Sequence, residues 1–109
     1  MLNNNYCHDV SAVLVTYNPD MEVLRAAILA VSGQVSDIFI VDNGSSNCSF
    51  DWFDKLEVSV NAKLHLLQQE DNVGIGAGHN IGIRRAIDQG SKFVLLLDQD
   101  SQIGAAHVR

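Results

Sequence analysis

The chain has 109 residues, of which 47% are apolar and 18% charged, enough for a single domain that buries a core of its own. Thirteen acidic residues against seven basic ones give a net charge of -6, the wrong sign for binding nucleic acid through its phosphates. Apolar runs such as residues 93–97 are far shorter than the roughly 20 residues that cross a bilayer. The composition therefore argues against nucleic acid as a partner and against a membrane span in this chain.

The start of the chain is polar and carries no Lys or Arg, unlike a secretory signal, which predicts a cytoplasmic location. Cys7 and Cys48 have no CxxC partner and no His at metal-ligand spacing, so we expect free thiols. We expect residues 1–9 to be a flexible segment and residues 10–109 to form the domain.

In the first half of the chain, residues 10–16 are almost wholly apolar and rich in β-branched side chains, which predicts a strand buried on both faces. Asp20 is positioned to cap a helix that ends at Gly33. One face of this helix is apolar and consists of Met21, Leu24, Ile28 and Val31. Residues 37–41 predict a second strand, followed by a cluster of turn-forming residues.

In the second half, residues 50–56 predict one helical turn and residues 63–68 a third strand. A glycine-rich segment, residues 72–78, leads into a helix that stops at Gly90. Residues 92–97 predict a fourth buried strand. The alternation of strands and helices indicates a Rossmann-like, three-layer α/β/α fold with a mostly parallel sheet. Polar segments follow every strand, so we expect them to meet at the sheet edge where such folds bind ligands.

Two acidic motifs follow strands. Asp98 and Asp100 form a D-x-D motif whose carboxylates point to the same side of an extended chain. Such oxygens suit a hard divalent cation that takes its other ligands from a diphosphate, although a solvated turn is the alternative. Asp42 could accept a hydrogen bond from a nucleobase or a ribose, or could cap the turn at Asn43 and Gly44.

The glycine-rich segment also resembles a dinucleotide fingerprint, because Gly76, Gly78 and Gly82 fit G-x-G-x-x-x-G. A dinucleotide-binding oxidoreductase is therefore an alternative. However, that fingerprint belongs at the first strand-helix turn, and here it follows the third strand. A non-catalytic nucleotide-binding module with a Rossmann-like fold is the third candidate.

Four blocks together resemble family 2 glycosyltransferases of the GT-A fold: residues 13–19 (VLVTYNP), 41–46 (VDNGSS), 72–82 (NVGIGAGHNIG) and 96–101 (LLDQDS). They are most similar to the bacterial rhamnosyltransferase branch, which builds cell-surface polysaccharides of the O-antigen type from dTDP-rhamnose. The resemblance implies an inverting, metal-dependent enzyme that moves a sugar from a nucleotide-diphospho-sugar to a saccharide or lipid-linked acceptor. It also implies that the full-length protein works at the inner face of the cytoplasmic membrane.

The resemblance assigns the nucleotide pocket to the first two loops. Asp42 would bind the base at its N3-H, and the other residues of the pocket would be Thr16, Tyr17, Asn18, Asn43 and Gly44.

The resemblance places the glycine-rich segment under the nucleotide, its glycines allowing close backbone approach. The binding residues there would be Asn72, Gly74, Gly78 and Asn80. Asp98 would contact the ribose or sugar, and Asp100 with Asp98 would hold Mg2+ or Mn2+. The general base of the family comes from the half of the domain that follows the D-x-D motif, so we expect it beyond Arg109. The chain would then bind donor without catalysing transfer alone.

Overall fold

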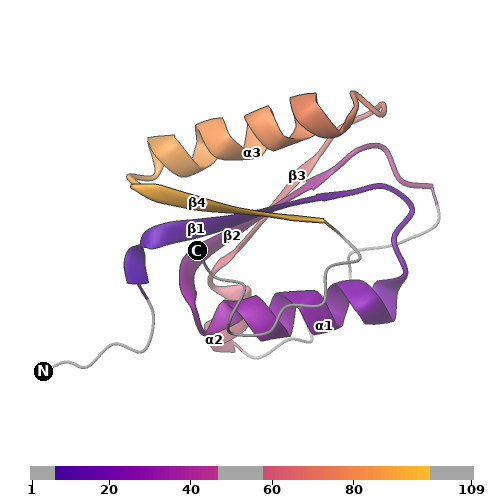
Figure 1. The fold of residues 1–109 in the computed structure, drawn as a ribbon. Coiled ribbons are helices and arrows are strands. Elements are labelled where there is room, and N and C mark those ends of the chain that lie inside the picture. Colours follow the sequence, from indigo (N-terminus) through magenta and orange to yellow (C-terminus); the bar gives the residue numbers. More distant parts are fainter. Residues whose placement is uncertain (1–6, 47–57, 99–109) are drawn as a thin grey trace, which may run out of the picture.

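The computed structural model describes residues 7–46 and 58–98. In chain order its elements are β1 (Cys7–Thr16), α1 (Met21–Ser32), β2 (Val35–Asp42), α2 (Val58–Asn61), β3 (Leu64–Gln68), α3 (Ile75–Asp88) and β4 (Phe93–Asp98). The four strands form one sheet in the order β3-β2-β1-β4, and every neighbouring pair is parallel. Helix α3 covers one face of the sheet, and α1 and α2 lie on the other (Figure 1). The predicted three-layer α/β/α fold is therefore confirmed. No helix in these two ranges has the length and apolar content needed to cross a bilayer.

The strands lie where the sequence predicts them, with differences at the starts of β1 and β2 and in the burial of β4. Strand β2 begins at Val35 rather than Asp37. Strand β4 is not buried as predicted, because it lies at the edge of the sheet and leaves Phe93 63% and Leu96 46% exposed.

Strand β1 begins at Cys7 rather than Val10, and Cys7 pairs with Val35 across an irregularity in the register. The polar residues His8 and Asp9 interrupt the apolar pattern there, although the backbone of Asp9 is paired and accepts a hydrogen bond from Lys92 N at 2.8 Å. The segment expected to be flexible thus overlaps β1, and the helical turn predicted over residues 50–56 lies outside the described residues.

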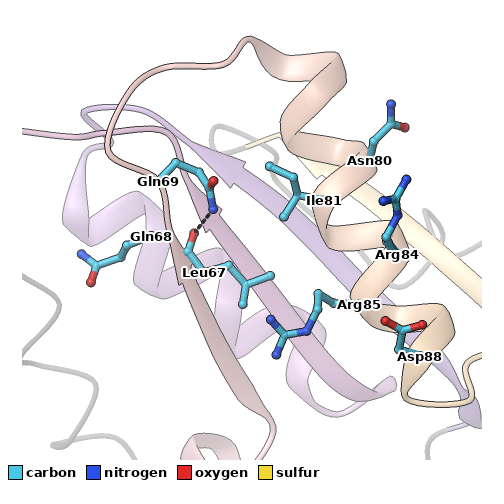
Figure 2. Close-up of a pocket in the computed structure, with 8 residues that line it drawn as sticks. All are labelled: Leu67, Gln68, Gln69, Asn80, Ile81, Arg84, Arg85 and Asp88. Atoms are coloured by element: carbon cyan, nitrogen blue, oxygen red, sulfur yellow. Dashed lines mark hydrogen bonds between the residues drawn. The ribbon is translucent and has the colours of Figure 1, made fainter.

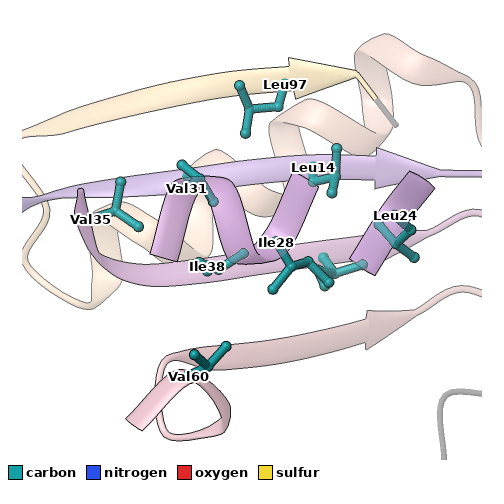
Figure 3. Packing of buried hydrophobic residues seen from close by; sticks show 10 residues of the cluster. Leu14, Leu24, Ile28, Val31, Val35, Ile38, Val60 and Leu97 are labelled. Carbon is teal, nitrogen blue, oxygen red and sulfur yellow. The ribbon is translucent and has the colours of Figure 1, made fainter. Parts of the chain in front are cut away.

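Helix α1 forms where the sequence predicts it. Asp20 caps it, since its Oδ1 accepts hydrogen bonds from the backbone N-H groups of Glu22 and Val23 at 3.0 and 3.2 Å. Its apolar face packs against side chains of β1, β2 and β4 on one face of the sheet (Figure 3). The buried cluster consists of Ala12, Leu14, Leu24, Ile28, Val31, Val35, Ile38, Ile40, Val60 and Leu97. Alternation along the strands sends the intervening residues, such as Val13 and Phe39, to the opposite face under α3.

Lys63 joins the end of α1 to the sheet. Its ammonium group donates hydrogen bonds to the backbone oxygen of Ser32 and, at 3.1 Å, to that of Val35. Burial lowers the pKa of Lys63, and the negative charge of Asp37 opposes this shift. One carbonyl group left open at the end of α1, that of Ser32, is thereby satisfied by a cation, which the helix dipole favours.

Helix α3 starts earlier than the sequence predicts. Gly74 precedes its first turn with φ +88°, and the glycines that follow are helical rather than part of a loop. Gly78, Gly82 and Ala86 form its buried face. An added Cβ at Gly82 would lie 2.3 Å from Cγ1 of Val13. Glycine is a poor helix former, but here the close packing of helix on sheet outweighs that preference.

Candidate functional site

All four strands end at one edge of the sheet, and polar residues stand at those ends (Figure 1). Across this edge Thr16 is opposite Asp42, and Asp42 is opposite Gln68. Asp98, the last residue of β4, is opposite Val15. The topology therefore brings together loops that are far apart in the sequence, as the alternation of elements predicts.

The carboxylate of Asp42 lies at the centre of this edge and is only 2% exposed. Its Oδ1 accepts hydrogen bonds from the hydroxyl groups of Thr16 at 2.7 Å and Ser45 at 2.6 Å. Its Oδ2 accepts one from the backbone N-H of Ser45 at 3.0 Å. Of the two roles open to Asp42, the structure shows the capping of the turn, while its contact with a nucleobase stays a prediction. Ser45 is not among the predicted site residues, although the sequence places it in the cluster of turn-forming residues after Asp42.

Ser45 also links the first two loops. Its hydroxyl oxygen accepts a hydrogen bond from Asn18 N at 2.7 Å, and Oδ1 of Asn18 accepts one from Ser46 N at 2.9 Å. Asn18 has φ +46°, a left-handed conformation that Asn tolerates better than most residues. Tyr17, beside it, is 47% exposed. The predicted pocket residues from these two loops thus form one connected unit.

Gly44 is the point at which the second loop contacts the segment after β3. It has φ +82°, and a Cβ there would lie 3.0 Å from the backbone oxygen of Glu70 and 3.2 Å from the Cα of Asp71. In addition, Gln69 N donates a hydrogen bond to the backbone oxygen of Asp42 at 2.8 Å. Only glycine meets both the backbone angle and the close approach without strain.

We predict that Gly44→Ala lowers the free energy of unfolding by about 3 kcal/mol, because the left-handed backbone and the backbone contacts both oppose a Cβ. Gly90→Ala is the matched control, since Gly90 has φ +94° but no atom within 4 Å of its Cβ position. That control should lose only the conformational share, about 1 kcal/mol. Urea unfolding measures the free energy of unfolding of both variants. Equal losses would show that the contact with Glu70 and Asp71 does not contribute to the cost of Gly44→Ala.

Two asparagines attach the first turn of α3 to the edge. Oδ1 of Asn72 accepts a hydrogen bond from Gly74 N at 2.8 Å, and Nδ2 of Asn43 donates one to the oxygen of Gly74 at 3.2 Å. Asn43 is 2% exposed. Its Oδ1 and Nε2 of His79 are buried atoms without a hydrogen-bond partner among the described residues. Unpaired buried polar atoms are rare, so His79, which is not among the predicted site residues, is a further candidate residue of the site.

Two of the remaining predicted residues, Gly78 and Asn80, face in different directions from α3. Gly78 faces the sheet, where its Cβ position is 2.9 Å from Cγ1 of Val15, so its lack of a side chain serves the contact between helix and sheet. Asn80 is exposed on another side of α3, because residues two apart in a helix differ in direction by about 200°. The side chain of Asp98 and the whole of Asp100 lie outside the described residues. Within the described ranges, no three His, Cys, Asp or Glu side chains are placed to hold a metal ion.

A parallel α/β sheet with carboxylate, hydroxyl and amide groups collected at its strand ends is typical of nucleotide-binding proteins. The family profile of glycosyl transferase family 2 matches residues 11–108, and the chain belongs to this family. This membership favours the glycosyltransferase prediction over a dinucleotide-binding oxidoreductase, whose fingerprint would lie between β1 and α1.

Two curated relatives are similar to the chain. It is 35% identical over 95 residues to the dTDP-rhamnosyl transferase RfbF of Shigella flexneri, covering 87% of this chain and 30% of that protein. It is 28% identical over 102 residues to the low-salt glycan biosynthesis hexosyltransferase Agl10 of Haloferax volcanii, covering 93% of this chain and 31% of that protein. The chain therefore spans less than a third of the length of either relative.

Proposed function

We propose that this chain is the donor-binding part of a glycosyltransferase that transfers a hexose, with dTDP-rhamnose as the donor, to a saccharide or lipid-linked acceptor of a cell-surface polysaccharide. Family membership supports the reaction class. The similarity to a protein named dTDP-rhamnosyl transferase supports the choice of donor.

The observation that carries this proposal is the hydrogen-bond network around Asp42. It fixes the loops after β1 and β2 to each other through Thr16, Asn18 and Ser45. A ligand can bind tightly to loops that are already ordered, because less conformational entropy is lost on binding. We infer that the nucleotide binds over these loops, with Tyr17 exposed for contact with its base or ribose.

The residues present fit a divalent cation by their chemistry. Asp98 ends β4 at the same edge as Asp42, and the D-x-D motif supplies carboxylate oxygens, the ligands that Mg2+ and Mn2+ prefer. Such a cation would offset the negative charge that develops on the leaving nucleoside diphosphate. In an acidic chain it would also reduce the repulsion between the protein and an anionic donor.

In the proposed transfer, the acceptor hydroxyl forms a bond to the anomeric carbon of the sugar, and the bond from that carbon to the diphosphate oxygen breaks. The electron pair leaves with the nucleoside diphosphate, and a carboxylate base takes the proton of the hydroxyl. We expect this base beyond Arg109, so the role of the residues in this chain is to bind and orient the donor.

We predict that dTDP stabilises the chain against heat only when Mg2+ or Mn2+ is present. At a concentration 100 times the dissociation constant, a ligand that binds only the folded state stabilises it by about 2.7 kcal/mol. Differential scanning calorimetry with dTDP, UDP and NAD, each with and without the metal, measures this effect. Stabilisation by NAD alone, or by dTDP regardless of metal, would contradict the proposal.

The matched variants are Asp100→Asn and Asp88→Asn. Both remove one negative charge, but Asp88 lies at the far end of α3, away from the strand ends (Figure 1). Asp100→Asn should abolish the metal-dependent part of the stabilisation, whereas Asp88→Asn should retain it. Loss of the effect in both variants would point to net charge rather than to the D-x-D motif.

A further inference from the structure

A pocket separate from the Asp42 network lies between α3 and the edge strand β3 (Figure 2). Its volume is 440 Å³, within the range of small-molecule sites. Leu67 of β3 and Ile81 of α3 form its apolar part, and Figure 2 shows them on facing sides of the gap. The polar residues that line it are Gln68, Gln69, Asn80, Arg84, Arg85 and Asp88.

Both arginines of α3 line this pocket. The sequence places Arg84 and Asp88 at the i,i+4 spacing of a helical ion pair, but no ion pair forms between them. Close contacts between acidic and basic side chains instead join Asp37 to the imidazole of His65 and Asp9 to Lys92. Neither guanidinium group is thus in ion-pair contact with a carboxylate of the described residues, and with Asp88 also in the lining the pocket keeps an excess of one positive charge in an acidic protein.

The amide side chains add further hydrogen-bond donors. Gln69 approaches from the end of β3, while the amide of Gln68 points away from α3, and on α3 the side chain of Arg84 extends toward Asn80 (Figure 2). Gln69 Nε2 is 3.5 Å from the backbone oxygen of Leu67, at the limit of a hydrogen bond, so this amide is hardly engaged. A guanidinium group binds a phosphate through two parallel N-H donors, and amide N-H groups complete such a site.

We propose that this pocket binds the phosphate group of a ligand other than the nucleotide-sugar donor. Arg84 and Arg85 outweigh the carboxylate of Asp88 in charge and so favour an anion, and Leu67 and Ile81 provide an apolar surface for the part of the ligand next to it. Asn80 is the one residue that lines this pocket and is also a predicted donor-binding residue. Its exposed position on this side of α3 fits a role in the pocket. The same chemistry is presented by a soluble phosphate ester and by an anionic lipid headgroup, and the test separates them.

The test titrates the chain with inorganic phosphate, following backbone amide shifts by nuclear magnetic resonance. A second arm measures cosedimentation with phosphatidic acid vesicles, with phosphatidylcholine vesicles as the reference. We expect shifts at residues 67–69 and 80–88, and a dissociation constant that rises with ionic strength because exposed charges are screened. Binding of free phosphate indicates a soluble ester. Binding of the acidic vesicles alone indicates a headgroup, and binding to neither overturns the proposal.

The variants are the double substitution of Arg84→Gln with Arg85→Gln, and Arg25→Gln as the control. Arg25 is also exposed on a helix, but α1 lies on the opposite face of the sheet (Figure 1). The double variant should weaken binding at least tenfold, equivalent to about 1.4 kcal/mol, while the control should not change it. Equal losses in both variants would show a general charge effect and overturn the proposal.

The same titration in the presence of saturating dTDP and Mg2+ separates this site from the donor site. We expect phosphate to bind with unchanged affinity, and the double variant to bind dTDP as the unmodified chain does. Displacement of phosphate by dTDP would mean that both occupy one site, which would overturn the inference without contradicting the proposed function.

Discussion

Gly82→Ala is expected to destabilise the protein by about 3 kcal/mol, near the upper end of the effects seen when a packed core is overfilled. The new methyl group would lie 2.3 Å from Cγ1 of Val13 and 3.2 Å from Cγ2 of Val41. Val13 is fully buried in β1, and a β-branched side chain has little rotational freedom with which to avoid the contact. Helix α3 would therefore have to move away from the sheet, and urea unfolding should show a lower midpoint.

Gly76→Ala is the control for this prediction because it makes the same change in the same helix. No atom lies within 4 Å of the Cβ position of Gly76, so alanine should raise stability by up to about 1 kcal/mol through its helix preference. Combining Gly82→Ala with Val13→Ala should recover at least about 1 kcal/mol relative to the sum of the two single losses. Additive losses would show that the contact between Gly82 and Val13 does not determine how closely α3 packs.

The order of elements could be predicted from the sequence because the signals are local. Apolar runs are typical of strands in a parallel sheet, and β2, β3 and β4 lie where those runs occur. That β3 and β4 are edge strands does not follow from these runs, because it depends on the order of the strands in the sheet. Helix α1 follows from the cap at Asp20 and the spacing of its apolar residues, since both act within a few residues. The predicted start of α3 was wrong. Gly78 and Gly82 pack closely against Val15 and Val13, and these contacts with a strand distant in the sequence favour a helix that a glycine-rich segment would not form by itself.

The candidate site could be predicted only in outline. Parallel topology alone brings the polar segments to one edge, and the sequence therefore predicts which loops meet. It does not predict that Ser45 connects Asp42 to Asn18, since this depends on hydrogen bonds between two loops joined by α1. Nor does it predict that Asn80 lies beside Arg84 at the pocket between α3 and β3, because that depends on the rotation of α3 about its axis.

Asp42→Asn is expected to cost about 3 kcal/mol of stability and to weaken the binding of dTDP with Mg2+. The carboxylate accepts hydrogen bonds on both oxygens, from two hydroxyl groups on Oδ1 and from Ser45 N on Oδ2. An amide has only one oxygen. If that oxygen takes the position of Oδ1, the amide nitrogen faces the N-H of Ser45 as a second donor, and if it takes the position of Oδ2, the nitrogen faces the hydroxyl groups. Either orientation leaves a buried group poorly paired, at a cost of about 1 to 3 kcal/mol for each such group.

Asp37→Asn provides the matched control within the same strand. Asp37 lies near the start of β2 rather than at its end, and its Oδ1 contacts Nε2 of His65 at 2.9 Å, a hydrogen bond that an amide oxygen can keep. The side chain of Asp37 is also 28% exposed, so its substitution should cost less than about 1 kcal/mol and leave the binding of dTDP unchanged.

Thr16→Val removes only one of the three donors to Asp42. Its loss in free energy of unfolding should therefore be about 1.5 kcal/mol, between the losses expected for Asp37→Asn and Asp42→Asn. Urea unfolding and calorimetric titration with dTDP together distinguish the roles of Asp42. If Asp42→Asn lost affinity at undiminished stability, the carboxylate would act on the ligand directly and not through the loops that it holds together.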